Sequence, residues 1–112
     1  MTTNFNGFQV QIMDAKIIDY LLNPEHPDGG SKARFFLSHN CSISNFNKLK
    51  NIISGHLTQS TKIRTEKSQY GIKLIAEGDI ILPDSFKTNV ISVWMLNEDR
   101  KIIKFVTCYP IK

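Results

Sequence analysis

The chain has 112 residues, of which 41% are hydrophobic and 21% charged, and its net charge is +4. These values fit one folded domain over residues 1–112 and exclude a disordered tail, a coiled-coil rod and a disulfide-dense mini-protein. The charge is uneven, because residues 31–73 hold eight Lys and Arg against Glu66 alone, whereas residues 1–30 hold one Lys against four acids. A basic middle suits a polyanion such as nucleic acid, and solvated helix and strand surfaces would explain it equally well.

The first part of the chain has helical periodicity. Apolar residues repeat at intervals of four between Asp14, which can cap a helix, and residue 22. Pro24 ends this helix, because proline disfavours helical backbone in the residue before it. The next segment, NPEHPDGGS at residues 23–31, contains two prolines and two glycines and predicts a structured turn or a binding loop.

Two more helices are expected after this loop. Ser31 can cap a short helix over KARFFLSH, and Ser44 can cap a longer one over residues 45–57, where apolar side chains recur at helical spacing. His39 and His56 lie near the ends of these two helices. A cationic side chain interacts favourably with the helix dipole there, so end capping explains both histidines.

After residue 60 the periodicity changes to two, which predicts strands joined by short turns. In the last strand, alternation places Phe105, Thr107 and Tyr109 on one face and Cys108 on the other. The expected strands cover residues 62–67, 70–76, 80–82, 88–96 and 101–109. This order of elements predicts an α+β fold, with two or three N-terminal helices packed on one face of an antiparallel sheet of about four strands.

The sequence contains no recognisable signal for export, for a membrane span or for a metal site. The N-terminus lacks the basic and apolar regions of a signal peptide, and no apolar run approaches the roughly 18 residues that cross a bilayer. Cys41 and Cys108 are far apart, which favours buried thiols over a disulfide, and no His and Cys residues have zinc-like spacing. We therefore expect a cytoplasmic protein without a cofactor, a metal or a membrane partner.

The loop around His26 is the strongest candidate for chemistry. Lys32 and Arg34 follow within eight residues, and the helix N-terminus expected after Gly29 and Gly30 would offer backbone N–H groups to an anion. A histidine that exchanges protons near neutral pH, beside two cations, suits phosphodiester chemistry. The alternative is a rigid turn in which His26 bonds to the loop and both cations are solvated, and the residues alone favour this alternative.

The segment DYLLNPEHPDGGSKARFF, residues 19–36, resembles the signature of a bacterial domain of unknown function. The tail, which includes Val93-Trp94 and residues 105–110, resembles the final hairpin of that family. The resemblance covers nearly the whole chain and implies no particular activity. It relates the chain to small stand-alone bacterial proteins and to domains appended to larger secreted toxin-like polypeptides.

More distantly, the chain resembles the barnase, colicin and RelE-like ribonuclease toxins, which place helices before a four-stranded antiparallel sheet. Many of these toxins pair an N-terminal His, followed by Gly and Lys, with a terminal strand of the form Thr-x-Tyr-Pro. The catalytic candidates implied by this resemblance are His26, Lys32 and Thr107. The implied phosphate-binding candidates are Gly29, Gly30, Arg34 and Tyr109.

The leading hypothesis is a metal-independent endoribonuclease, in which His26 takes the proton from the attacking 2′-hydroxyl of RNA or protonates the leaving oxygen. The alternative is a non-enzymatic module that binds nucleic acid or a protein. RNA and a cognate neutralising protein are the partners that these hypotheses imply. The enzyme hypothesis requires that His26, Lys32 and Thr107 meet at one open site.

Overall fold

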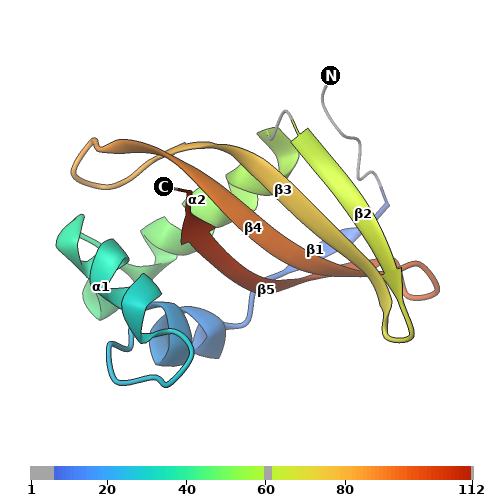
Figure 1. Cartoon of the computed structure of the whole chain (residues 1–112), viewed down its shortest axis with the longest axis horizontal. Coiled ribbons are helices and arrows are strands. Elements are labelled where there is room, and N and C mark those ends of the chain that lie inside the picture. The colour runs from blue at the N-terminus through green and yellow to red at the C-terminus, as the bar shows by residue number, and fades with distance from the viewer. Residues whose placement is uncertain (1–6, 60–61, 112) are drawn as a thin grey trace.

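The computed structural model describes residues 7–59 and 62–111, which fold into one curved sheet flanked by helices (Figure 1). The strands are β1 (Gln9–Gln11), β2 (Lys62–Ser68), β3 (Gly71–Ile81), β4 (Lys87–Asn97) and β5 (Ile102–Pro110). The helical segments are η1 (Lys16–Leu21), α1 (Gly30–Ser38), the short turn η2 (Ile43–Asn45) and α2 (Phe46–Gln59). The spatial order of the strands is β1-β5-β4-β3-β2.

The predicted architecture is wrong in two respects, although the fold does combine helices with a sheet. The first described element is the strand β1, which precedes every described helix. β1 pairs in parallel with β5, with Val10 opposite Ile103, so the described sheet has five strands and is mixed. β1 has only three residues, too few for periodicity to reveal, and its partner lies near the other end of the chain.

The remaining strands, β2 to β5, form the predicted antiparallel meander. One difference is that β3 runs without a break through residues 77–79, which separate the expected strands at 70–76 and 80–82. Gly78 keeps its register with Val90 of β4, so the glycine is accommodated inside a regular ladder. The two long central strands therefore form a continuous platform for the helices.

The three predicted helices are confirmed, with different starts. η1 is wound as a π-helix, in which the N–H of Leu22 donates to the carbonyl of Ile17, five residues earlier. Ser31 lies inside α1 and does not cap it. Ser42, and not Ser44, forms the capping box that begins η2, directly ahead of α2.

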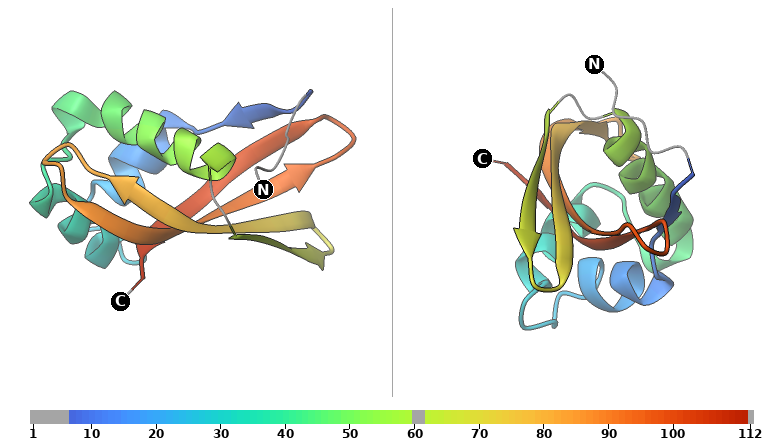
Figure 2. Two further views of the ribbon diagram at one scale, coloured as in Figure 1. Left: turned by 90° about the horizontal axis from the view of Figure 1, so that it is seen from above. Right: turned by 90° about the vertical axis from the view of Figure 1, so that its right-hand side faces the viewer.

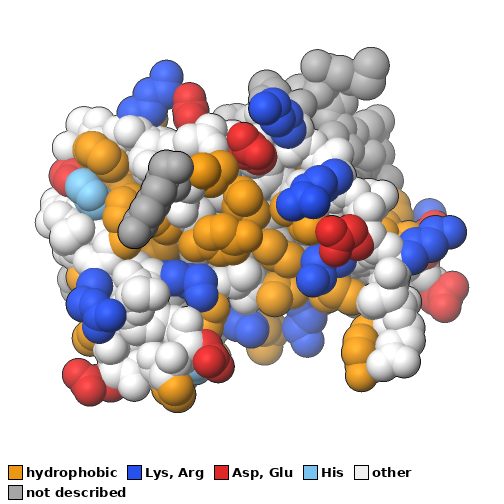
Figure 3. Space-filling view, in the orientation of Figure 1, with side chains coloured by type: hydrophobic (Ala, Val, Ile, Leu, Met, Phe, Trp, Pro, Cys, Tyr) orange, Lys and Arg blue, Asp and Glu red, His pale blue; other side chains and the backbone are white. Residues whose placement is uncertain are grey.

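The core lies between α2 and one face of the sheet (Figure 2). Leu49, Ile53 and Leu57 of α2 are fully buried there, and Trp94 and Phe105 are the largest buried side chains of the strands. η1 and α1 gather at one end of the sheet, beside the final half of β5 (Figure 2). The opposite face of the sheet forms the surface seen in Figure 3 and is called the outer face below.

His56 belongs to this core, so its predicted role as a cap of α2 is wrong. Its Nε2–H donates to the carbonyl of Gly78 at 3.1 Å, and its Nδ1 accepts from the hydroxyl of Ser92 at 2.8 Å. The same hydroxyl accepts from the indole N–H of Trp94 at 2.8 Å. Burial lowers the pKa of His56 and favours the neutral ring that this network needs.

Cys41 and Cys108 are free buried thiols, as the sequence predicts. Burial, followed by the negative charge of Asp84, raises the pKa of Cys41 to about 11. Burial alone raises the pKa of Cys108 to about 12. Both side chains therefore act as small apolar core residues and not as nucleophiles.

Candidate functional site

A bulge in β5 brings Thr107 and Tyr109 to the outer face. Consecutive residues of β4 pair with Thr107 and Phe105, so Val106 is an extra residue in β5. Phe105 and Cys108 are both buried, and Thr107 and Tyr109 consequently lie on the face opposite to them. The prediction that Phe105 shares a face with Thr107 is wrong, because the extra residue reverses the alternation.

The π-helix η1 places Tyr20 against this part of β5. Ile17 and Leu21 are fully buried and anchor η1 in the core. The hydroxyl of Tyr20 lies 2.9 Å from Oγ1 of Thr107, in a hydrogen bond that joins the N-terminal helical region to the last strand. β1 ends opposite Lys104, so η1 occupies the stretch of β5 edge that β1 leaves uncovered.

His26 holds the loop after η1 closed. Its Nδ1 accepts hydrogen bonds from the backbone N–H groups of Asp28 and Gly29, each 3.0 Å long. Its ring packs nearly perpendicular to that of Tyr20, with the centroids 5.0 Å apart. Because Nδ1 accepts two bonds, the proton of the neutral imidazole lies on Nε2, which makes His26 a hydrogen-bond donor.

Gly29 and Gly30 allow this loop to lie against η1. A Cβ at Gly29 would come within 2.7 Å of the carbonyl oxygen of Tyr20, and a Cβ at Gly30 would come within 2.6 Å of that of Pro24. The N–H of Gly29 donates to Nδ1 of His26, and the N–H of Gly30 donates to the carbonyl of His26 at 2.9 Å. Both amides thus bond within the loop, and the visible role of the glycines is close packing.

Two lysines lie over the Tyr20 ring. The Nζ atoms of Lys16 and Lys32 are each 5.4 Å from its centroid, within cation–π range. Nζ of Lys32 also donates to the carbonyl of Asp28 at 3.2 Å. Arg34 is exposed and lies two residues after Lys32, so it projects from another side of α1. The residues gathered here, called the Tyr20 cluster below, are Lys16, Tyr20, His26, Lys32 and Thr107.

A hollow of about 400 Å³ lies between the first turns of α1 and the end of β5. It is called the α1–β5 hollow below. Its lining residues are Ser31, Lys32, Phe35, Tyr109 and Pro110. Lys32 belongs to both the hollow and the Tyr20 cluster, so the two features adjoin.

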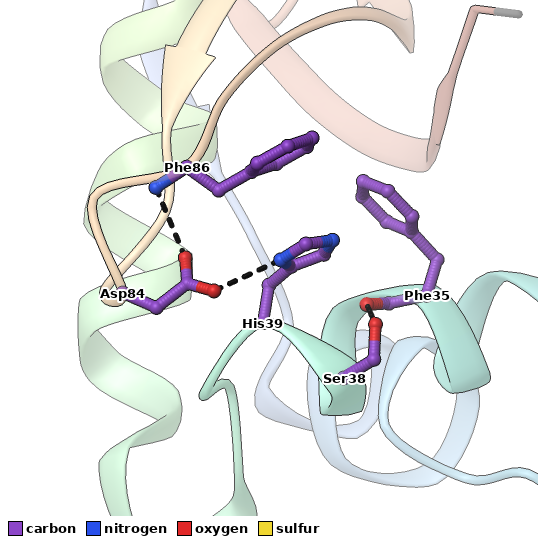
Figure 4. A network of polar contacts seen from close by, with 5 residues as sticks. All are labelled: Phe35, Ser38, His39, Asp84 and Phe86. Atoms are coloured by element: carbon purple, nitrogen blue, oxygen red, sulfur yellow. Dashed lines mark hydrogen bonds and ion pairs between the residues drawn. The ribbon is translucent and has the colours of Figure 1, made fainter.

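A second histidine, His39, packs against the ring of Phe35 (Figure 4). His39 is the C-cap residue of α1, but its Nδ1 lies 2.9 Å from a carboxylate oxygen of Asp84 in the loop between β3 and β4. The imidazole stacks on Phe86 with centroids 4.2 Å apart, and Phe35 contacts it at 4.9 Å. The hydrogen bond with His39 lowers the pKa of Asp84. Helix capping alone therefore does not account for His39.

The outer face is apolar along its middle, with Lys and Arg groups and some Asp and Glu groups at its borders (Figure 3). Ile75 pairs across the strands with Val93, and Met95 lies between Lys73 and Lys104 on its neighbouring strands. Both of these lysines are exposed. The face thus combines an apolar surface with positive charge, next to the Tyr20 cluster.

Four of the predicted site residues therefore come together where the His26 loop meets β5, namely His26, Lys32, Thr107 and, through the hollow, Tyr109. Sequence reasoning missed Tyr20 and Lys16, because the Tyr20 hydroxyl meets a strand 87 positions away. In residues 7–59 and 62–111, no group of three or more His, Cys, Asp or Glu is placed to hold a metal ion. No helix in the same residues is long and apolar enough to cross a membrane.

Comparisons with known proteins show a shared fold and a family for this chain. A chain of a contact-dependent growth inhibition toxin–immunity protein complex from Klebsiella pneumoniae 342 superposes with a TM-score of 0.71, over 89% of this chain and 98% of that chain. The two sequences are 21% identical, so the likeness shows a shared fold. No curated protein matches the chain. The family described as Domain of unknown function (DUF6883) matches residues 5–112, and the chain therefore belongs to this family.

Proposed function

We propose that the protein is a toxin-like endoribonuclease that acts at the Tyr20 cluster. The observation that supports this proposal is the meeting of the His26 loop with β5 at the Tyr20–Thr107 hydrogen bond, together with two ammonium groups over the Tyr20 ring. Hydroxyl donors and positive charge around one point of the surface suit a phosphodiester group. The fold shared with a chain of a toxin–immunity complex is consistent with this class of function.

The proposed reaction uses RNA, these side chains and water. The 2′-hydroxyl of RNA attacks the adjacent phosphorus, the bond from phosphorus to the 5′-oxygen breaks, and the products are a 2′,3′-cyclic phosphate and a 5′-hydroxyl. Lys16 and Lys32 neutralise the charge that builds on the non-bridging oxygens. The hydroxyls of Tyr20 and Thr107 share one hydrogen bond, and the hydroxyl that accepts it keeps its own proton to orient the phosphate.

His26 has a hydrogen-bond donor role in this proposal, in place of the two roles in the leading hypothesis, which were to take the proton from the 2′-hydroxyl or to protonate the leaving oxygen. A general base needs a ring nitrogen that carries neither a proton nor another bond, and Nδ1 is engaged by two backbone amides. His26 instead stabilises the phosphate through Nε2–H, and its Nδ1 keeps the loop against Tyr20. The proton released by the 2′-hydroxyl passes to water, and the 5′-oxygen takes a proton from water.

The test is cleavage of total RNA by the purified protein in the presence of a chelator. We expect products with 2′,3′-cyclic phosphate ends, and a rate that Lys32→Ala and Thr107→Val each lower by roughly 10- to 1,000-fold. Lys48→Ala, which removes an exposed lysine of α2, is the matched control and should leave the rate unchanged. The proposal is wrong if the wild-type protein cleaves nothing, or if folded Lys32→Ala cleaves at the wild-type rate.

A second candidate function is the binding of an acidic partner protein on the outer face. The apolar middle of that face, bordered by Lys73 and Lys104, favours a partner with an apolar centre and a negative rim. If expression of the protein arrests growth, a genomic library can be selected for a neutralising protein that restores growth. The double variant Lys73→Glu with Lys104→Glu should then escape neutralisation.

Salt-dependent RNA binding without cleavage would instead identify a nucleic-acid-binding module.

A further inference from the structure

We propose that the α1–β5 hollow is a subsite for one unpaired nucleobase of single-stranded RNA, next to the phosphate held by the Tyr20 cluster. The inference rests on the proposed ribonuclease function for the class of ligand. It adds what that function leaves open, which is how the RNA strand is positioned and whether the strand must be unpaired.

The walls of the hollow suit a flat aromatic ligand. Phe35 from α1 and Tyr109 from β5 are half-buried side chains that both line it, with Pro110 beside them. A volume of about 400 Å³ lies within the range of small-molecule sites. Bases that stack on aromatic side chains gain roughly 1–3 kcal/mol each, independent of their identity. The hydroxyls of Ser31 and Tyr109 add polar groups that can meet a base edge.

Phe35 is fixed by its contact with His39, so the hollow does not depend on the ligand for its shape. Its ring packs on His39, which in turn stacks on Phe86 with an interplanar angle of 10° (Figure 4). The 2.9 Å contact between His39 and Asp84 fixes the imidazole within this stack. A preformed aromatic wall loses little entropy when a base binds, which favours recognition of a flexible strand.

Lys32 connects the hollow to the phosphate site. Its side chain lines the hollow, and its Nζ lies 5.4 Å from the centre of the Tyr20 ring. A nucleotide whose phosphate contacts Nζ of Lys32 can therefore direct its base between Phe35 and Tyr109. A base in a duplex is already stacked and paired, so only a single strand can supply this base without unpairing.

The experiment measures binding of a fluorescent 2′-O-methyl RNA hexamer, which lacks the attacking hydroxyl and reports binding without cleavage. Phe35→Leu and Tyr109→Leu each keep an apolar side chain and remove an aromatic face. We expect each to weaken binding by roughly 5- to 100-fold. The control is Tyr70→Leu, because Tyr70 is 82% exposed at the β2–β3 turn, at the end of the sheet away from α1 (Figure 1). It should bind as the wild type does.

The outcomes test the subsite proposal and the ribonuclease proposal separately. The subsite is refuted if both folded leucine variants bind the hexamer with wild-type affinity, or if a duplex of the same sequence binds as tightly as the single strand. That result stands even if the wild-type protein cleaves RNA. If the hexamer binds and Phe35→Leu weakens it while the wild type cleaves no RNA, the subsite is supported and the ribonuclease proposal fails.

Discussion

The hydroxyl of Ser92 joins two large side chains in the core, and its removal tests how much this network stabilises the fold. Ser92 is fully buried, accepts a hydrogen bond from the indole N–H of Trp94, and donates one to Nδ1 of His56, both at 2.8 Å. In Ser92→Ala the indole loses its acceptor in a dry environment, at a cost of about 1–3 kcal/mol. The lost bond to His56 adds about 1 kcal/mol. We therefore expect the free energy of unfolding to fall by about 2–4 kcal/mol.

The assay is equilibrium unfolding in urea, followed by far-ultraviolet circular dichroism. Ser54→Ala, at a half-buried position of α2, is the control and should change the free energy of unfolding by less than about 0.5 kcal/mol. In a Trp94→Phe background, which removes the indole donor, Ser92→Ala should cost about 1–3 kcal/mol less than in the wild type. A cost below about 1 kcal/mol, or an equal cost in both backgrounds, would refute the reasoning.

Three more measurements test other parts of the structure. Gly29→Ala should lower the free energy of unfolding by about 1–3 kcal/mol, because its Cβ would meet the carbonyl of Tyr20 at 2.7 Å. Gly55→Ala, whose Cβ meets nothing within 4 Å on α2, should raise it by about 0.5–1 kcal/mol, and urea titrations that do not separate the two variants would contradict the packing argument. Because the pKa of His56 is lowered from 6.5 on folding, the unfolded chain binds a proton that the native state does not. Stability should consequently decline by up to about 1.4 kcal/mol per pH unit below pH 6.5, and a urea midpoint that stays constant between pH 7.5 and 5 would contradict this. Cys108, whose pKa is raised to about 12, should react with a thiol reagent at pH 8 only after unfolding, so rapid labelling of the native protein would disprove its burial.

Local patterns were sufficient to locate most of the secondary structure. The periodicity of the helices, the stop at Pro24 and the alternation of the long strands are each contained in a short window of sequence. β1 could not be found in this way, because its three residues are defined by their pairing with the distant β5. The bulge is equally invisible, since Val106 has the same strand propensity as its neighbours and only the register with β4 makes it an extra residue.

The candidate site was predictable in its residue types but not in its arrangement. His26 could be selected because it lies in a loop with unusual composition, Lys32 because it follows that loop, and Thr107 because of its place in the tail. The residue that joins them is Tyr20, and nothing in its local sequence distinguishes it from other residues of an amphipathic helix. The pairing of His39 with Asp84 spans 45 positions and crosses from a helix end to a strand loop, so no local pattern marks it.

The parallel pairing of β1 has a consequence for the order of folding. Gln9 pairs with Ile102, and the stretch between them includes every described helix and the strands β2, β3 and β4. Closing so long a loop costs considerable chain entropy and gains only three residue pairs, whereas each hairpin of the meander closes over a few residues. We therefore expect the meander and α2 to form first, with the edge of β5 open to other strands until β1 docks. The strand that comes first in the sequence is then the last to enter the sheet.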